Sequence, residues 1–192
     1  MEPLTLAEQE KVLATARNCQ HEGIRNHAIV LTFLDTGLRE SELADSSIGN
    51  LNLEDGYMKV LGKGSKERVV PIGVYCQQTL TNYVDNVRPV PQNDNFNNLF
   101  LTSAGKPISA NTIKLLFHRL AKASGIERLH AHLCRHTFAV NYIMNGGDLS
   151  SLKEILGHMT FEMVNHYLHF TKSQITAQHR KYSPMDRLHL HK

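Results

Sequence analysis

The spacing of the apolar residues differs in one stretch of this sequence, and that stretch limits the fold more than any other feature. Between Leu51 and Ile72 they fall in short alternating runs, as in β-strands, whereas on either side they recur every three or four residues, as in amphipathic helices. The sequence therefore predicts a mainly α protein with one small antiparallel β-sheet, in the α+β class.

Turn residues divide the strand-like stretch into three parts. Glu54-Asp-Gly56 and Gly62-Lys-Gly-Ser-Lys66 contain the glycines that turns between antiparallel strands favour. The strands expected beside these turns are Leu51 to Leu53, Tyr57–Leu61 and Arg68–Ile72.

Capping residues and glycines indicate where the helices begin and end. Thr5 and Glu8 have the spacing of a capping box, Gly37 is a natural helix-ending residue, and Ser109 precedes an apolar face with helical spacing. The expected helices are 5–19, 24–36, a start at 39–45, 74–85, one from 109 past 120, 132–145, 148–156 and 161–170.

Composition narrows the class of protein. The 192 residues suffice for one domain with a core, and no apolar run approaches the ~20 residues of a membrane helix. With no secretory signal at the start, we expect a cytoplasmic protein. Three widely spaced cysteines, an odd number, argue against a disulfide framework. The formal net charge of +3 permits nucleic-acid binding without demanding it.

Arg39 and Glu42 are the first candidate site residues. Arg39 follows the helix-ending Gly37 in Thr-Gly-Leu-Arg-Glu-Ser-Glu-Leu, and Glu42 lies three residues on, where its carboxylate can hold the guanidinium. Taken alone, the pair is better explained as an ordinary surface ion pair.

Lys63 is the second candidate, between two glycines at the tip of the expected hairpin. From that position a lysine can reach a bound nucleic-acid backbone. Lysine and glycine are also common in exposed turns, so this signal is weak by itself.

The third candidate is a histidine-rich segment. His132 and Arg135 are three residues apart and face the same way on a helix. On a strand, alternate residues would instead form a face of zinc ligands: His130, His132, Cys134 and His136. The helical pattern that follows favours the helix, and no second cysteine-histidine cluster completes a zinc site.

Two further residues lie near the end of the chain. His158 follows a helix-ending glycine in Leu-Gly-His, and Tyr167 comes nine residues later. A lone tyrosine on a helix is normally a half-buried core residue. Nothing local distinguishes Tyr167 from the other five tyrosines.

The order of these motifs carries more information than any one of them. Arg-x-x-Glu after Thr-Gly-Leu, a Gly-Lys-Gly hairpin, His-x-x-Arg-His, Leu-Gly-His and a following tyrosine together resemble the signature of the tyrosine recombinases, the phage integrase family. The resemblance covers roughly Thr5 to Phe170. It implies that family's catalytic-domain fold and a site-specific recombinase or integrase that cleaves and rejoins double-stranded DNA without metal, cofactor or ATP.

The resemblance also implies roles for individual residues. Tyr167 would be the nucleophile and form a 3′-phosphotyrosine, and Glu42 would orient Arg39. The residues implied to activate the phosphodiester are Arg39, Lys63, His132, Arg135 and His158. Arginine forks suit the non-bridging phosphate oxygens, and Lys63 is the candidate acid for the leaving 5′ oxygen.

Basic residues near this set are expected to follow the DNA backbone, although at least half of them are equally well explained as solvated surface. They are Lys59, Lys66, Arg68, Lys114, Arg119 and Lys122.

The sequence departs from the family pattern in two ways. Cys134 stands where leucine is common, and the N-terminal helical domain with which family members clamp DNA is absent from these 192 residues. We therefore expect a single catalytic domain over 1–192, either an excised fragment or a naturally short protein. The tail Thr171–Lys192 is expected to pack on a neighbouring subunit of a tetramer on DNA, with a monomer in isolation.

Two other functions on the same fold stay open at this stage. A type IB topoisomerase shares the chemistry, and a DNA-binding regulator would keep the fold without the reaction. The Thr-Gly-Leu-Arg and Leu-Gly-His contexts favour the recombinase over the first. The complete set from Arg39 to Tyr167 favours an enzyme over the second.

Overall fold

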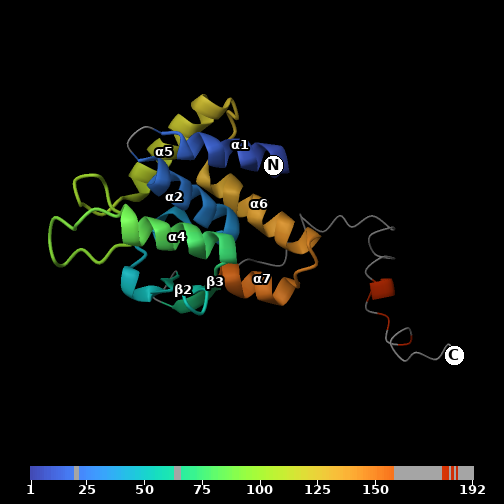
Figure 1. Cartoon of the computed structure of the whole chain (residues 1–192). Coiled ribbons are helices and arrows are strands. Elements are labelled where there is room, and N and C mark those ends of the chain that lie inside the picture. Colours follow the sequence, from blue (N-terminus) through green and yellow to red (C-terminus); the bar gives the residue numbers. More distant parts are fainter. Residues whose placement is uncertain (20–21, 63–65, 158–178, 182, 184, 186–192) are drawn as a thin grey trace. The chain divides into compact units, whose positions relative to one another are not determined.

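The computed structural model describes residues 1–19, 22–62, 66–157, 179–181, 183 and 185 (Figure 1). The chain divides into two units, Met1–His158 and Met159–Lys192, and the elements described here belong to the first. In chain order they are α1 (Leu6–Arg17), α2 (Gly23–Thr36), α3 (Glu40–Ala44), the 3-10 turn η1 (Ile48–Asn50), β1 (Leu51–Asn52), β2 (Tyr57–Leu61), β3 (Glu67–Pro71), α4 (Val74–Asn86), α5 (Ala110–Ser124), α6 (Ala131–Met144) and α7 (Leu149–Leu156).

The predicted fold class is confirmed, because these elements are helices and one three-stranded antiparallel sheet. The two predicted caps, Thr5 and Ser109, are also confirmed. Thr5 and Glu8 close a capping box on α1, and the Ser109 side chain accepts a hydrogen bond from the backbone of Thr112. The helix predicted over 161–170 lies outside the described residues.

The sheet has the order β1-β2-β3, and each neighbouring pair is antiparallel. β1 is shorter than predicted: it contains only Leu51 and Asn52, and Leu53 already belongs to the turn. The reason is local, since the Asn52 side chain accepts a hydrogen bond from the Asp55 backbone N–H at 2.9 Å and closes the turn early.

Helix α2 forms the centre of the core. Ten of its 14 residues are buried, from Arg25 to Phe33 and at Thr36, which is the burial expected of a helix covered on all sides. It packs against α1, α4 and α6, and Figure 1 shows it running between α1 and α4.

Gly37 brings the end of α2 close to two other helices. Its φ of 63° lies in the left-handed region that glycine tolerates best. A Cβ at this position would lie 2.6 Å from both Leu156 Cδ2 and Phe138 Cδ1. The glycine therefore allows the residues just after α2 to lie directly against α6 and α7, where the site is built.

All three cysteines are free, which agrees with their odd number. Burial raises the pKa of the Cys76 and Cys134 thiols, so both stay protonated at neutral pH. Within the described residues, no helix combines the length and apolar character that crossing a membrane requires.

Candidate active site

Glu42 is the centre of a buried ionic network. Its side chain is 4% exposed, and its carboxylate accepts four hydrogen bonds from two arginines. The backbone N–H and Nη1 of Arg39 each donate at 2.8 Å. Nη1 and Nη2 of Arg68 donate to the two carboxylate oxygens at 2.7 and 2.9 Å. Glu42 thus holds the Arg39 guanidinium, as their spacing predicts, but shares its charge with a second arginine.

The network keeps Glu42 ionised. Burial would raise the pKa of the carboxyl, but hydrogen bonds from Arg68 and from the Arg39 backbone oppose that effect and lower the pKa to about 2. One carboxylate therefore faces two guanidinium groups, and the network has an excess of positive charge.

Arg68 is more buried than its place beside the hairpin predicts. Instead of projecting from the hairpin surface as a phosphate contact, its side chain is 13% exposed, and its Nε donates to the carbonyl of Ile155 at 2.7 Å. The strand's alternation contains the signal that would have found this position. Arg68 shares the inner face of β3 with the buried Val70, and its register partner on β2 is the buried Val60.

Arg135, from α6, is the third arginine of the site and is buried. Its Nη1 donates to the carbonyl of Gly37 at 2.6 Å, and its Nη2 donates to the carbonyl of Leu156 at 2.9 Å. One guanidinium therefore joins the end of α2 to the end of α7.

Three consecutive carbonyls at the end of α7 each accept from a different arginine. The pairs are Arg68 Nε to Ile155 at 2.7 Å, Arg135 Nη2 to Leu156 at 2.9 Å and Arg39 Nη2 to Gly157 at 3.0 Å. The last carbonyls of a helix lack intrahelical donors and carry partial negative charge, so cations are favourable there. β3, α6 and the start of α3 meet at this point.

Arg39 is the most open of these three arginines. Its side chain is 40% exposed, against 13% for that of Arg68. An anion approaching the network from solvent therefore meets Arg39 first. Two guanidinium groups, those of Arg39 and Arg135, converge on the neighbouring carbonyls of Gly157 and Leu156.

His132 lies on α6 one turn before Arg135 and is exposed. Partial desolvation and the charge of Arg135 lower the pKa of its imidazole. A histidine with a lowered pKa is neutral at physiological pH and can accept a proton.

Three of the predicted site residues lie outside the described residues: Lys63, His158 and Tyr167. Their places in the sequence are nevertheless informative. Lys63 directly follows Gly62, whose backbone N–H donates to the Lys66 carbonyl at 2.8 Å. His158 directly follows Gly157, whose carbonyl is bound by Arg39.

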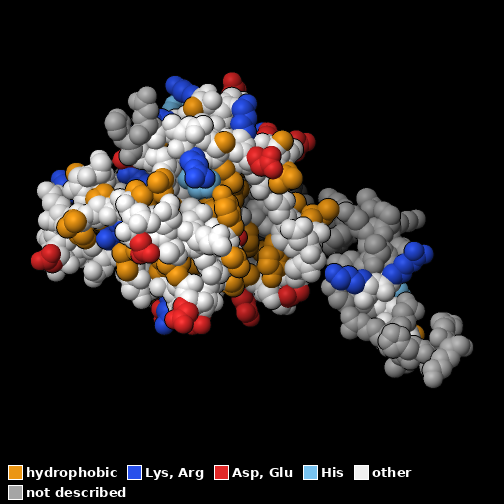
Figure 2. Space-filling view, viewed as in Figure 1, with side chains coloured by type: hydrophobic (Ala, Val, Ile, Leu, Met, Phe, Trp, Pro, Cys, Tyr) orange, Lys and Arg blue, Asp and Glu red, His pale blue; other side chains and the backbone are white. Residues whose placement is uncertain are grey.

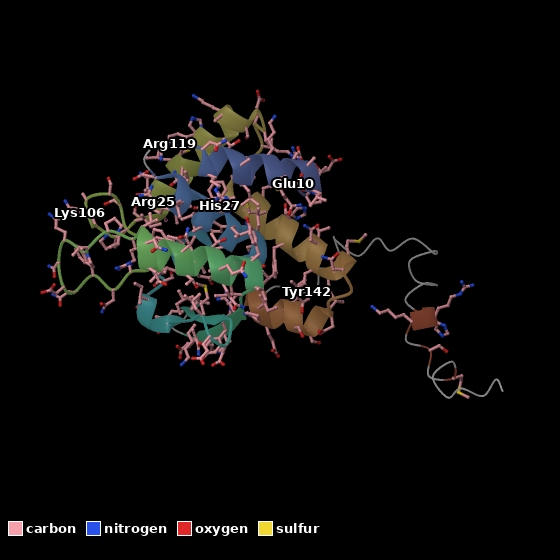
Figure 3. All side chains as sticks on the ribbon, viewed as in Figure 1. Glu10, Arg25, His27, Lys106, Arg119 and Tyr142 are labelled. Atoms are coloured by element: carbon pink, nitrogen blue, oxygen red, sulfur yellow. The ribbon has the colours of Figure 1, made fainter. Side chains whose placement is uncertain are left out.

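The exposed basic residues predicted to contact DNA fall into two groups. Lys59 and Lys66 are exposed beside the hairpin. The α5 group comprises Lys114, Arg119 and Lys122, also exposed, and Lys114 Nζ lies 3.9 Å from Glu40 on α3. Arg119 is on the side of the molecule away from β2 and β3 in Figure 3. Among the described residues on the face shown in Figure 2, basic and acidic side chains are scattered and form no single basic patch.

The histidine-rich segment is helical. His132, Cys134 and His136 all lie on α6, which distributes alternate residues around the helix axis, and His130 is its N-cap. Among the residues that the structure describes, no group of three His, Cys, Asp or Glu side chains is arranged to hold a metal ion.

Known proteins of similar sequence are tyrosine recombinases. The chain is 34% identical over 183 residues to the tyrosine recombinase XerD of Staphylococcus saprophyticus, covering 94% of this chain and 62% of that protein. It is 31% identical over 169 residues to the tyrosine recombinase XerC of the same organism, covering 88% of this chain and 57% of the relative. The chain therefore spans about three fifths of the length of these relatives.

Solved structures show the same fold. The XerA recombinase crystal structure is 27% identical with a TM-score of 0.78, and the match covers 96% of this chain and 66% of that one. The XerH site-specific recombinase bound to its difH substrate is 25% identical with a TM-score of 0.74, covering 92% and 52%. The profile of the phage integrase family matches residues 2–174, almost the whole chain. This protein belongs to the phage integrase family, the tyrosine recombinases.

Proposed function

We propose that this chain is the catalytic domain of a site-specific DNA recombinase, which cleaves and rejoins DNA strands through a covalent 3′-phosphotyrosine on Tyr167. The observation that carries the proposal is the convergence of Arg39 and Arg135 on the end of α7. His158 is the next residue in the chain, and Tyr167 follows nine residues later. Two arginine forks therefore bind the end of the helix that precedes the proposed nucleophile in the sequence.

The proposed reaction assigns one task to each residue. The Tyr167 oxygen attacks the phosphorus and loses its proton to His132, while the bond to the 5′ oxygen breaks and Lys63 protonates that oxygen. Arg39, Arg135 and His158 stabilise the charge that develops on the two non-bridging oxygens. The lowered pKa of His132 suits a proton acceptor. The phosphotyrosine ester preserves the bond energy, so attack by a 5′ hydroxyl reverses the step without ATP.

The arginines and Lys63 would supply the positive charge that a metal ion supplies in other phosphoryl-transfer sites. Glu42 supports this role indirectly, because it fixes both the backbone N–H and the guanidinium of Arg39.

We also propose the salt-dependent phosphate contacts expected of exposed cations near the site. The residues concerned are Lys59, Lys66, Lys114, Arg119 and Lys122. XerH is described as bound to its difH substrate, and a phage lambda integrase as a dimer bound to a core site. By analogy with such complexes, double-stranded DNA is the proposed partner of this chain.

The assembly that we propose is a tetramer on two DNA sites, with the tail from Thr171 on a neighbouring subunit and a monomer in the absence of DNA. The proposed compartment is the cytoplasm. Sedimentation of the protein alone and with a duplex carrying the cleaved site measures the assembly. A stable tetramer without DNA would contradict the proposal.

The proposed reaction is tested with nicked duplexes that tile the DNA flanking the gene. A nick next to the cleavage site lets the released end diffuse away, so the covalent complex accumulates and survives a denaturing gel. We expect an adduct that mass spectrometry assigns to Tyr167. Tyr167→Phe should abolish it, whereas Tyr75→Phe, a matched change at an exposed tyrosine of α4, should retain it.

An adduct on a different residue would show that the nucleophile is wrongly assigned. Duplex binding that is tight and site-specific, but yields no adduct on any nicked substrate, would instead support the DNA-binding regulator.

A further inference from the structure

We propose that Arg68 is a positioning residue that neutralises Glu42, so that the positive charge of Arg39 stays available to a DNA phosphate. This role rests on the DNA-cleaving function proposed above. It replaces the direct phosphate contact that the sequence suggested for Arg68.

The contacts of Arg68 leave its guanidinium poorly placed to bind a DNA phosphate. Each of its three guanidinium nitrogens donates to a protein acceptor: Nη1 and Nη2 to Glu42 and Nε to the Ile155 carbonyl. Its side chain is 13% exposed, and turning it toward solvent would leave the carboxylate of Glu42 without its bidentate partner. Arg68 therefore acts through Glu42.

The contact between Arg68 and Glu42 determines how much of the positive charge of Arg39 is neutralised within the network. Glu42 is 4% exposed and must have a cation beside it, because an unpaired buried carboxylate is costly. With Arg68 present, that cation comes from β3, and Arg39 needs to donate only its backbone N–H and Nη1. Without Arg68, Arg39 would be the only arginine bound to Glu42, and an incoming phosphate would meet a neutral pair.

The contact of Arg68 with the Ile155 carbonyl also helps to fix the position of Arg39. Arg68 joins the inner face of β3 to the last turn of α7, and Arg39 binds the Gly157 carbonyl two residues later. Fixing Glu42 and the end of α7 together fixes the two groups that hold Arg39. The strand β3 is thereby connected to the end of α7.

The experiment compares Arg68→Met with the double variant Arg68→Met/Glu42→Gln. Both are made in a Tyr167→Phe background, so that binding is measured without cleavage. The ligand is the fluorescent duplex that gives the most adduct with the unmodified protein, and its affinity is followed over a range of salt concentrations. The slope of log affinity against log salt counts the phosphate charges that the protein neutralises, about 0.9 for each.

We expect Arg68→Met to reduce this slope by about 0.9, because Glu42 then neutralises Arg39. Removing the negative charge in the double variant should restore the slope, since Arg39 is again unpaired. Lys59→Met is the matched control. It removes an exposed positive charge from the neighbouring strand without touching Glu42, so Glu42→Gln is not expected to reverse its effect.

Two results would overturn the proposal. A slope that stays reduced in the double variant would make Arg68 a direct phosphate contact. A slope unchanged in the folded single variant would make its role purely structural. If Arg68→Met does not fold, the double variant, which removes both buried charges and leaves neither unpaired, still separates the proposal from a direct phosphate contact. The titration of Glu42 described next is then measured in Arg68→Lys, where a raised pKa supports the charge balance and an unchanged one contradicts it.

A second measurement needs no DNA and therefore separates this proposal from the proposed function. Carbon-13 NMR follows the titration of the Glu42 carboxyl in the unliganded protein. Its pKa, about 2 with Arg68 in place, should rise in Arg68→Met because burial then acts with less opposition. An unchanged pKa would refute the charge balance even if every duplex failed to give an adduct.

Discussion

Helices α1 and α3 begin with the same device in two different environments. In each, a glutamate at the third helical position accepts the backbone N–H of the N-cap residue, Glu8 from Thr5 at 2.9 Å and Glu42 from Arg39 at 2.8 Å. In each, an arginine distant in sequence binds the carboxylate through both Nη atoms. The pKa of both carboxyls is about 2.

The difference lies in burial and in the N-cap residue. The Glu8 side chain is 25% exposed and its partner Arg128 is 41% exposed, whereas Glu42 is 4% exposed. Thr5 only caps α1, but Arg39 contributes its guanidinium to the site as well. The same sequence pattern can therefore begin a helix at the surface in one place and build a buried ionic network in another. The spacing of the residues is the same in both helices, and the burial of the carboxylate determines which of the two structures forms.

The largest expected difference is in the response to losing the carboxylate. Glu42→Ala leaves Arg68 buried without its partner and should cost about 3–5 kcal/mol of unfolding free energy. Glu8→Ala removes a helix cap and an exposed ion pair and should cost ~1 kcal/mol. Urea unfolding at neutral pH measures both. Equal losses would mean that the two networks are energetically alike despite their burial.

Substitutions of the two N-cap residues should affect different properties, the reaction rate for Arg39 and the stability for Thr5. Arg39→Ala is expected to slow adduct formation by about 10²–10³-fold, the usual effect of removing a donor to the developing charge. It should change stability little, because Glu42 keeps Arg68. Thr5→Ala should cost ~1 kcal/mol of stability and leave the rate per folded molecule unchanged. A similar rate in both variants would remove Arg39 from the reacting centre.

Acid should affect the two glutamates unequally. Because folding lowers the pKa of Glu42 from 4.5 to about 2, its contribution is fully present above pH 4.5 and is lost as the pH falls through about 2. That contribution is at most about 3 kcal/mol. The pKa of Glu8 is lowered similarly, but its exposure screens the effect. The test measures the urea midpoints of the parent protein, Glu42→Gln and Glu8→Gln from neutral pH downward. The difference between each variant and the parent gives the contribution of that glutamate at each pH. Parallel curves for the two variants would contradict it.

The smallest expected effect is that of Arg128→Ala. The pair with Glu8 is exposed, so its loss should cost about 0.2–1 kcal/mol, and most of that should vanish in ~1 M salt. Adduct formation should be unchanged. Melting temperatures at low and high salt give the answer, and a large loss that persists in salt would show that this pair is not a simple surface contact.

Much of the fold could be predicted because its signals are local. The capping box of Thr5 and Glu8, the helix-ending Gly37 and the apolar stripe of α5 each lie within a few residues in sequence. The error at Leu53 is also local, since the Asn52 side chain closes the turn before the strand can include it.

The site was harder to predict, because its contacts join distant parts of the chain. The Arg39–Glu42 pair follows from spacing, but Arg68 is 26 residues from Glu42 and its burial depends on the register of β3. A charged residue in a hairpin is normally expected at the surface, and only the strand's alternation indicates otherwise. The assignments of Lys63, His158 and Tyr167 stay predictions from the motif pattern.

The arginine contacts at the end of α7 have a consequence for insertions and deletions. One residue added within this eight-residue helix would turn its last carbonyls by about 100° and move them by ~1.5 Å. All three arginines would then lose their acceptors together. The length of α7 is therefore expected to tolerate change far less than its exposed side chains do.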